Sequence, residues 1–239
     1  MKLRYATPAI VLLLTVASAL AYTSLLINGT KFNSSTPTIF TLSQPVKPNW
    51  EADIVPNLQY NLSTSKIYID LLYNPKNDLT ATSNGAYNSP TGYSRIRIKI
   101  SAEGSVPIIY YLTNSSENNE VILYQSTANV LGAGSTTDLS PQRTLKVFWI
   151  ENKLTISVFD GNKEIARLVN GLTLGQGWTI THVGVWSDET PTPVKAGYVQ
   201  VSFGTPTATF VATDFLYALI PLIVLVAAIA AVTKMLNKV

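Results

Sequence analysis

Two pairs of carboxylates are spaced in a way that suits acid and base chemistry. Glu51 and Asp53 are one residue apart, so on a strand their side chains would share a face, about 6–7 Å from each other. Asp188 and Glu189 form a second pair. Glycoside hydrolysis uses two carboxyl groups about 5–9 Å apart. The four residues are therefore candidate catalytic residues of a glycoside hydrolase, and solvated strand or loop positions are the alternative.

Tryptophan rings could stack on a sugar beside these acids. Trp149 and Trp186 lie among alternating apolar residues and are predicted to be buried. Trp50 and Trp178 lie near predicted turns. If any indole ring is exposed to bind a ligand, we expect it to be one of these two.

A row of cations could bind an acidic ligand. Arg95, Arg97 and Lys99 alternate with three isoleucines, so the isoleucines face a core and the cations face away from it. These cations are candidate binding residues for acidic glycans or another anionic partner. A solvated outer face without a ligand is the alternative.

Four asparagines fit the acceptor pattern for N-glycosylation: Asn28, Asn33, Asn61 and Asn114. A chain this rich in asparagine, serine and threonine would contain several such patterns by chance. All four nevertheless lie in the first half of the chain, next to predicted turns, so they are candidate glycosylation sites.

The sequence offers little for metal or protease chemistry. It contains no cysteine and one histidine, His182, which excludes the usual zinc and iron–sulfur sites. Alternation places His182 on the same face as Trp186, where a packed side chain is expected rather than a catalytic base. We therefore expect no metal and no cofactor, and an enzyme is the less favoured interpretation.

The body of the chain is predicted to be all β. Strict alternation indicates strands over 67–73, 95–100 and 199–203. Further strands are expected near 38–42, 108–112, 121–125, 144–149, 154–158, 164–169 and 178–186, with turns at Glu151-Asn152, Asp160-Gly161-Asn162 and Asn170-Gly171. Ten or more short strands at this spacing predict a β-sandwich or jelly roll. Two long loops, 74–92 and 132–141, are candidate binding loops.

One stretch resembles a known group of domains. Leu145, Val147 and Trp149 share a face, an Asp160-Gly161 hairpin follows, and Gly184-Val185-Trp186 completes a later strand. Residues 144–187 resemble concanavalin-like and laminin-G-like jelly rolls. The resemblance implies a sandwich with a glycan-binding or adhesive role. The acidic strand of the glucanases in that group is not evident here.

Both ends of the chain carry apolar segments. Residues 1–21 have the layout of a secretory signal peptide, and residues 215–233 are predicted to be a transmembrane helix, because the 18 uncharged residues 215–232 alone span about 27 Å. The predicted organisation is an extracytoplasmic domain over 22–204, a stalk over 205–214 and a cytoplasmic tail over 234–239. An uncleaved N-terminal anchor, as in archaeal pilins, is the alternative.

Charge excludes one class of partner. Four of the seventeen basic residues lie in the terminal segments, which leaves thirteen basic residues in the domain against thirteen acidic ones, the fourteenth acid being Asp214 of the stalk. A nucleic-acid-binding domain needs a surplus of cations, so no nucleic acid is expected. Only 13% of residues are charged, about half the usual ~25%. This composition is similar to that of exported proteins of acidophilic archaea or their viruses.

The sequence thus predicts a single-pass protein of a cell membrane or viral envelope, with an all-β sandwich outside and the C-terminus in the cytoplasm. Its expected role is binding, adhesion or structure, with glycans or other surface proteins as partners and the lipid bilayer contacted through 215–233. Self-association through small residues in that helix is a further possibility. A membrane-tethered glycoside hydrolase and a subunit of an archaeal surface filament or layer are the alternatives.

Overall fold

The chain folds into two facing antiparallel sheets, so the all-β prediction is confirmed. The computed structural model describes residues 23–62, 64–101, 107–112, 120–125, 130–131, 138–139, 143–174, 179–188 and 193–205. The chain divides into a unit of Met1–Thr205 and a unit of Pro206–Val239. Outside the described residues lie the predicted signal peptide, nearly all of the stalk, the predicted helix 215–233, the tail, Trp178, Glu189 and Asn114. No helix within the described ranges is long and apolar enough to cross a membrane.

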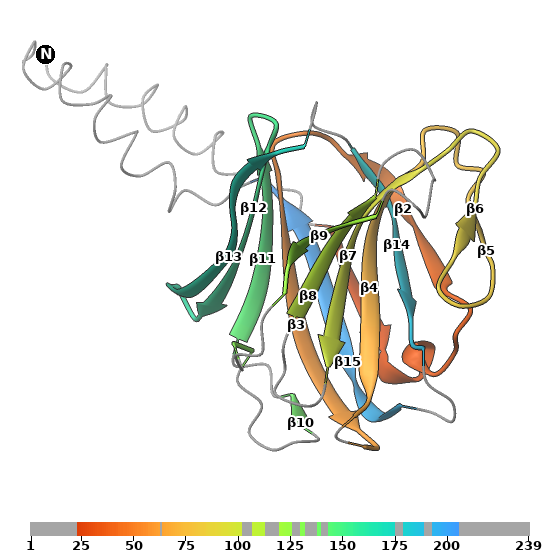
Figure 1. The fold of residues 1–239 in the computed structure, drawn as a ribbon, viewed down its shortest axis with the longest axis vertical. Helices are drawn as coiled ribbons and strands as arrows, with labels where there is room; N and C mark the ends of the chain where they lie inside the picture. Colours follow the sequence, from red (N-terminus) through yellow and green to blue (C-terminus); the bar gives the residue numbers. More distant parts are fainter. Residues whose placement is uncertain are drawn as a thin grey trace, which may run out of the picture. The chain divides into compact units, whose positions relative to one another are not determined.

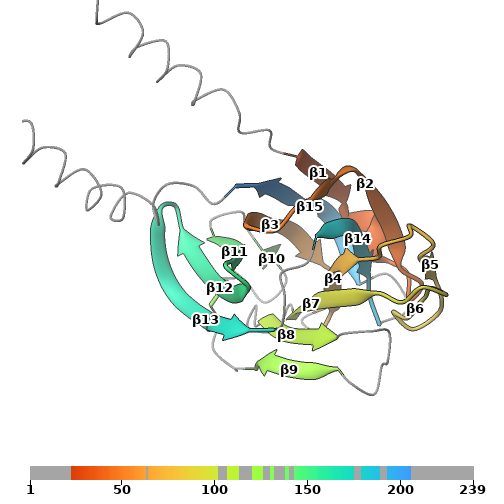
Figure 2. The ribbon, with the colours of Figure 1, turned by 90° about the horizontal axis from the view of Figure 1, so that it is seen from above.

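The two sheets form the layers of a sandwich (Figures 1 and 2). Sheet A has the order β1 (Thr23–Asn28), β15 (Val194–Gly204), β3 (Trp50–Tyr60), β11 (Arg143–Ile150), β12 (Lys153–Asp160) and β13 (Lys163–Thr173), with β10 (Asp138–Leu139) also paired to β3. Sheet B has the order β2 (Thr38–Val46), β14 (Ile180–Trp186), β4 (Lys66–Tyr73), β7 (Ser94–Ser101), β8 (Pro107–Leu112) and β9 (Val121–Tyr124). A 3₁₀ turn, η1 (Gly29–Phe32), and the two-residue strands β5 (Thr80–Ala81) and β6 (Tyr87–Asn88) complete the described elements.

The core lies between the inner faces of the two sheets. Alternate residues of the longer strands enter it, as the period of two requires. Ile96, Ile98 and Ile100 of β7 are fully buried there, as the sequence predicts. From sheet A, Trp50 and Trp149 stack in the core with ring centroids 6.0 Å apart.

The hairpins of sheet A follow the predicted turns, with one exception. Glu151 and Asn152 both have positive φ, 51° and 64°, which gives the primed turn that two-residue hairpins favour. Asn170-Gly171 does not end a strand. It lies within β13, where the register against β12 shifts and Gly171 adopts a φ of 60°. The pair therefore forms a bulge rather than the predicted turn.

Strand β3 crosses the centre of sheet A although it contains a proline. Pro56 has no N–H to donate, which normally confines proline to edges and bulges. On one side, β3 pairs with β15 along nearly its whole length. On its other side, β3 pairs with β11 from Trp50 to Ile54 and with β10 at Leu58 and Gln59. Pro56 thus falls between the two partners on that side, where no ladder bond to β11 or β10 is required.

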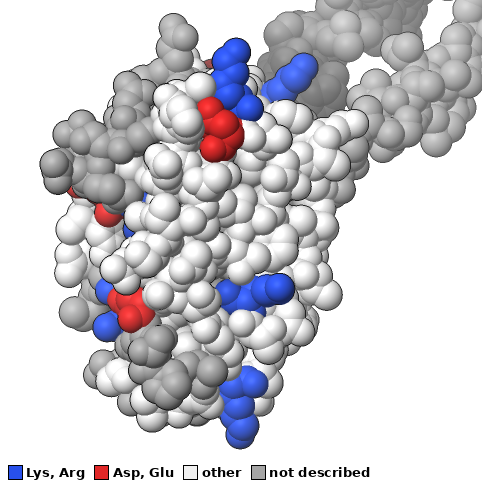
Figure 3. Space-filling view, turned by 90° about the vertical axis from the view of Figure 1, so that its right-hand side faces the viewer, with Lys and Arg blue, Asp and Glu red and all other residues white. Residues whose placement is uncertain are grey.

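The segment from Asn74 to Tyr93, here called the covering segment, is not the open loop that the sequence predicts. It contains the β5–β6 hairpin and lies against the outer face of sheet B (Figures 1 and 2). Its base is closed by side chains: Asn74 Nδ2 donates to Asp78 Oδ1 at 2.9 Å and Ser89 Oγ at 2.8 Å. Charged groups are few on the side of the molecule that carries β5 and β6 (Figure 3).

Candidate functional site

The outer face of sheet B gathers polar side chains that neighbouring strands bring into line. β4 places Asp70 opposite Arg97 of β7, and β8 places Tyr110 on the other side of Arg97. β14 places Gly184 beside Asp70. Because the register is antiparallel and continuous, these residues form one row across four strands. The row runs partly beneath the covering segment.

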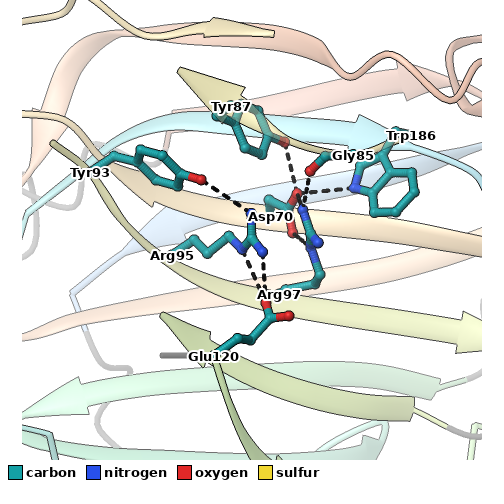
Figure 4. Close-up of polar contacts among 8 residues, drawn as sticks. All are labelled: Asp70, Gly85, Tyr87, Tyr93, Arg95, Arg97, Glu120 and Trp186. Carbon is teal, nitrogen blue, oxygen red and sulfur yellow. Dashed lines mark hydrogen bonds and ion pairs between the residues drawn. The ribbon is translucent and has the colours of Figure 1, made fainter. Parts of the chain in front are cut away.

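A buried ion pair occupies the middle of this row (Figure 4). Arg97 Nε donates to Asp70 Oδ1 at 2.7 Å, and Arg97 Nη2 donates to Asp70 Oδ2 at 2.9 Å. Asp70 Oδ2 also accepts from Tyr87 Oη at 2.7 Å and from Trp186 Nε1 at 3.1 Å. Both charged side chains are almost excluded from solvent. Burial alone would lower the pKa of Arg97, but the charge and the hydrogen bonds of Asp70, with smaller contributions from Tyr87 and Glu120, together outweigh it and raise the pKa.

The covering segment is fastened to this ion pair. Tyr87 contributes its hydroxyl, and the carbonyl of Gly85 accepts a hydrogen bond from Arg97 Nη2. Gly85 has a φ of 70° and lies directly on the indole ring of Trp186, where a Cβ would overlap the ring. Burial, followed by the charge of Asp70, raises the pKa of Tyr87 well above its usual range.

A second buried cation lies beside the first. Arg95 is fully buried, and its Nη2 contacts Glu120 Oε1 at 2.8 Å. Its Nη1 also donates to Tyr93 Oη at 3.4 Å, at the end of the covering segment (Figure 4). Arg95 and Arg97 are therefore neither a solvated stripe, the alternative interpretation of the sequence, nor exposed to an external anionic ligand. The two guanidinium groups face away from the core as expected, but carboxylates and the covering segment enclose them.

Beside the covering segment the face is partly open, and we call this part the Tyr68 rim, made of Tyr68, Lys99, Tyr110 and Asp188. Tyr68 stacks on Trp186 with ring centroids 3.9 Å apart and planes at 9°. Its hydroxyl donates to Asp188 Oδ2 at 2.6 Å, and Lys99 Nζ lies 5.6 Å from its ring centroid.

The other three residues of the rim reach solvent to different degrees. Asp188 is exposed, and Lys99 and Tyr110 are half-buried. Burial raises the pKa of Tyr110, and the charges of Glu120 and Asp188 act on it in the same direction. Tyr110 and Asp188 therefore lie within electrostatic reach of each other.

The other predicted acids lie on the opposite outer face of the sandwich. Glu51 and Asp53 point outward from β3, and Lys146 of β11 contacts both, with Nζ 2.6 Å from Glu51 Oε1 and 3.1 Å from Asp53 Oδ2. Asp188 lies on sheet B. The structure therefore does not bring the Glu51–Asp53 pair and Asp188 together in one cleft.

Trp50 is not exposed, contrary to expectation. Its ring is fully buried against Trp149, and it only lines a cavity of about 250 Å³ near the start of β1 and the end of β15.

His182 is also buried. Its Nδ1 lies 2.8 Å from Thr181 Oγ1, and its Nε2 lies 2.6 Å from Asn77 Oδ1. Burial lowers the pKa of His182. The predicted packed histidine is confirmed.

The described glycosylation candidates differ in their surroundings. Asn28 and Asn61 are exposed. Asn28 caps η1, because its Oδ1 accepts from Thr30 N at 2.9 Å. Asn33 is half-buried and bonds both the N–H and the carbonyl of Val194, each at 3.0 Å. Attached sugar at these asparagines stays a prediction.

No cluster of three or more metal-ligating side chains occurs among the described residues.

Three residues that are central to the polar clusters are not candidates in the sequence. Asp70, Tyr87 and Lys146 each become significant through a partner more than fifteen residues away. A signal existed only for Asp70, an acid at an outward position of a strand whose other residues after Lys66 are aliphatic or aromatic.

Comparison with known proteins gives likenesses of fold. No family model and no curated protein sequence matches the chain. The fold is similar to a fructofuranosidase from Schwanniomyces occidentalis, with 12% identity, a TM-score of 0.49 and 77% of this chain covered. This chain spans about a third of that protein, 34% of its length.

Two smaller proteins are also similar to this chain. One is a Bacillus subtilis protein of unknown function with a galectin-like fold, at 10% identity, a TM-score of 0.45 and 77% and 89% of the two chains covered. The other is a legume lectin-like domain from Entamoeba histolytica, at 14% identity, a TM-score of 0.43 and coverages of 76% and 87%. Both are described by lectin-type folds, galectin-like in one case and legume lectin-like in the other.

Proposed function

We propose that the chain is a surface-displayed, membrane-anchored binding module that takes an uncharged glycan at the Tyr68 rim. The observation that carries the proposal is the placement of Asp188. This carboxylate is exposed, yet the hydroxyl of Tyr68, a largely buried residue, holds it in place at 2.6 Å. A fixed carboxylate can accept hydrogen bonds from two sugar hydroxyls without first losing conformational freedom.

The neighbours of Asp188 supply the other parts of a sugar site. Tyr110 offers a partly exposed ring for an apolar sugar face, and Lys99 offers a donor. The charges favour a neutral ligand. Arg97 is neutralised by Asp70 and Arg95 by Glu120, so Lys99 and Asp188 add one charge of each sign to the rim.

The membrane anchor rests on the apolar segment 215–233, and display on the cell surface or a viral envelope rests on residues 1–21 together with that segment. A hydrolase is not proposed, because the described carboxylates of the two predicted pairs lie on different sheets.

A glycan array probed with the full-length chain tests the function. Binding to neutral glycans is expected, at least ten-fold weaker for Asp188→Asn and for Tyr110→Ala. The matched control is Asp160→Asn, which removes an exposed carboxylate from sheet A and should bind as the wild type does. Preference for sulfated or sialylated glycans, or full binding by Asp188→Asn, would overturn the proposal.

A further inference from the structure

We infer that Lys146 and Asp53 are placed to form an intramolecular amide bond that covalently joins β11 to β3, with Glu51 transferring the protons. The two residues lie directly opposite each other in neighbouring strands. Lys146 Nζ is 3.1 Å from Asp53 Oδ1 and 3.1 Å from Asp53 Oδ2. The nitrogen therefore faces the carboxyl group symmetrically, within contact distance of the carbon that it would attack.

Glu51 supplies the second group that the reaction needs. Its side chain is 1% exposed, and its Oε1 lies 2.6 Å from the same nitrogen. From this position it can accept a proton from the Lys146 ammonium and donate it to the departing oxygen of Asp53. Its place is fixed by backbone pairing, since Glu51 lies opposite Phe148 in the same ladder.

The surroundings favour the uncharged form of Asp53 but the charged form of Lys146. The ring of Phe159 lies 5.4 Å from Lys146 Nζ, and Phe148 packs edge-on against Phe159. Burial raises the pKa of Asp53 to about 6, although Lys146 opposes that rise. Burial also disfavours the charged amine, but contact with Glu51 and Asp53 raises the pKa of Lys146. The neutral amine therefore arises by proton transfer inside the cluster, and we expect the bond to form slowly.

The reaction balances without a co-reactant. The bond that forms joins Lys146 Nζ to Asp53 Cγ, and the bond that breaks joins Cγ to one carboxyl oxygen. That oxygen leaves as water with two of the three ammonium protons, and the third stays on the amide nitrogen. No atom is oxidised or reduced. Holding amine and acid in contact on two paired strands supplies an effective concentration that can reach about 10⁵ M or more, which favours condensation in water.

The mass of the full-length chain tests the inference. The wild type is compared with Lys146→Arg prepared in parallel, so that any trimming or attached sugar cancels. After the known mass difference between lysine and arginine is subtracted, the wild type is expected to be lighter than Lys146→Arg by the mass of one water molecule. A digest should contain a peptide from β3 joined to a peptide from β11. Glu51→Gln keeps both reacting residues, and we expect it to leave them unjoined.

Lys153→Arg is the matched control, because it changes an exposed lysine on the same sheet and should retain the loss of water. A wild-type mass that differs from Lys146→Arg only by the substitution would overturn the inference. So would a loss of water that persists in Lys146→Arg, since it would then arise elsewhere, for example at the Asp160-Gly161 step. The test is independent of the glycan site.

Discussion

Replacing Asp70 by asparagine removes the negative charge from the buried centre of sheet B and leaves its shape nearly unchanged. Arg97 would then remain buried without its charged partner, and Tyr87 and Trp186 would donate to a neutral amide. The covering segment depends on the same group, because Tyr87 belongs to it. We expect the substitution to loosen the outer face of sheet B and to lower the stability of the whole domain.

The magnitude follows from the burial of both charges. Removing one partner of a buried ion pair costs about 3–5 kcal/mol, because the other charge is left uncompensated. The side chains of Asp70 and Arg97 are 0% and 9% exposed, so little of this cost is relieved by solvent. Arg97→Met in the Asp70→Asn background removes the orphaned charge and should restore roughly half of the loss.

Urea unfolding of the four proteins of this cycle, followed by tryptophan fluorescence, measures the effect. With a slope of about 2 kcal/mol per molar urea, the midpoint for Asp70→Asn should fall by roughly 1.5–2.5 M. The exposed pair Arg167–Glu164 is the control, and Arg167→Gln should change stability by less than about 0.5 kcal/mol. The reasoning is refuted if Asp70→Asn lowers the free energy of unfolding by less than about 1 kcal/mol. It is also refuted if Asp70→Asn lowers that free energy equally in the wild-type and Arg97→Met backgrounds.

Three further predictions follow from packing and protonation. A Cβ on Gly184 would overlap the hydroxyl of Tyr87, so Gly184→Ala should cost about 1–3 kcal/mol, and less in a Tyr87→Phe background, by thermal or urea unfolding. Burial lowers the pKa of His182, so its contribution to stability is complete above pH 6.5 and is lost as the pH falls below that value. His182→Gln should therefore reduce the acid sensitivity of the melting temperature; equal sensitivity would contradict the assignment. Asn33→Ala removes two bonds to the backbone of β15 and should cost about 1–3 kcal/mol in urea unfolding.

The sequence predicts the sandwich well because alternation is a local signal. Ile96, Ile98 and Ile100 indicate their strand without reference to any other part of the chain, and Glu151-Asn152 indicates its turn in the same way. β3 is not among the strands that the sequence predicts. Its proline argues against a central strand, and the gap between β11 and β10 that accommodates Pro56 is visible only in the assembled sheet.

The site was harder to predict because its chemistry depends on register. Arg97 reads as a solvated cation until β4 is paired to β7, which places Asp70 opposite it. The covering segment looks polar and open, since only Tyr87 and Tyr93 are large apolar residues buried by its folding. A sequence can show which face a residue occupies, but it does not show which distant segment will lie over that face.

The pairing of the first and last described strands decides how the domain responds to tension. Thr23 begins β1 and lies opposite Phe203 near the end of β15. The N-terminal end of β1 and the C-terminal end of β15 therefore lie at the same end of sheet A. A force that separates Thr23 from Thr205 would load the Thr23–Phe203 pair first and then each following pair in turn. Strands pulled in this way open one rung at a time, at lower force than strands sheared along their length. Sheet A should therefore lose β1 by unzipping before its central strands bear load.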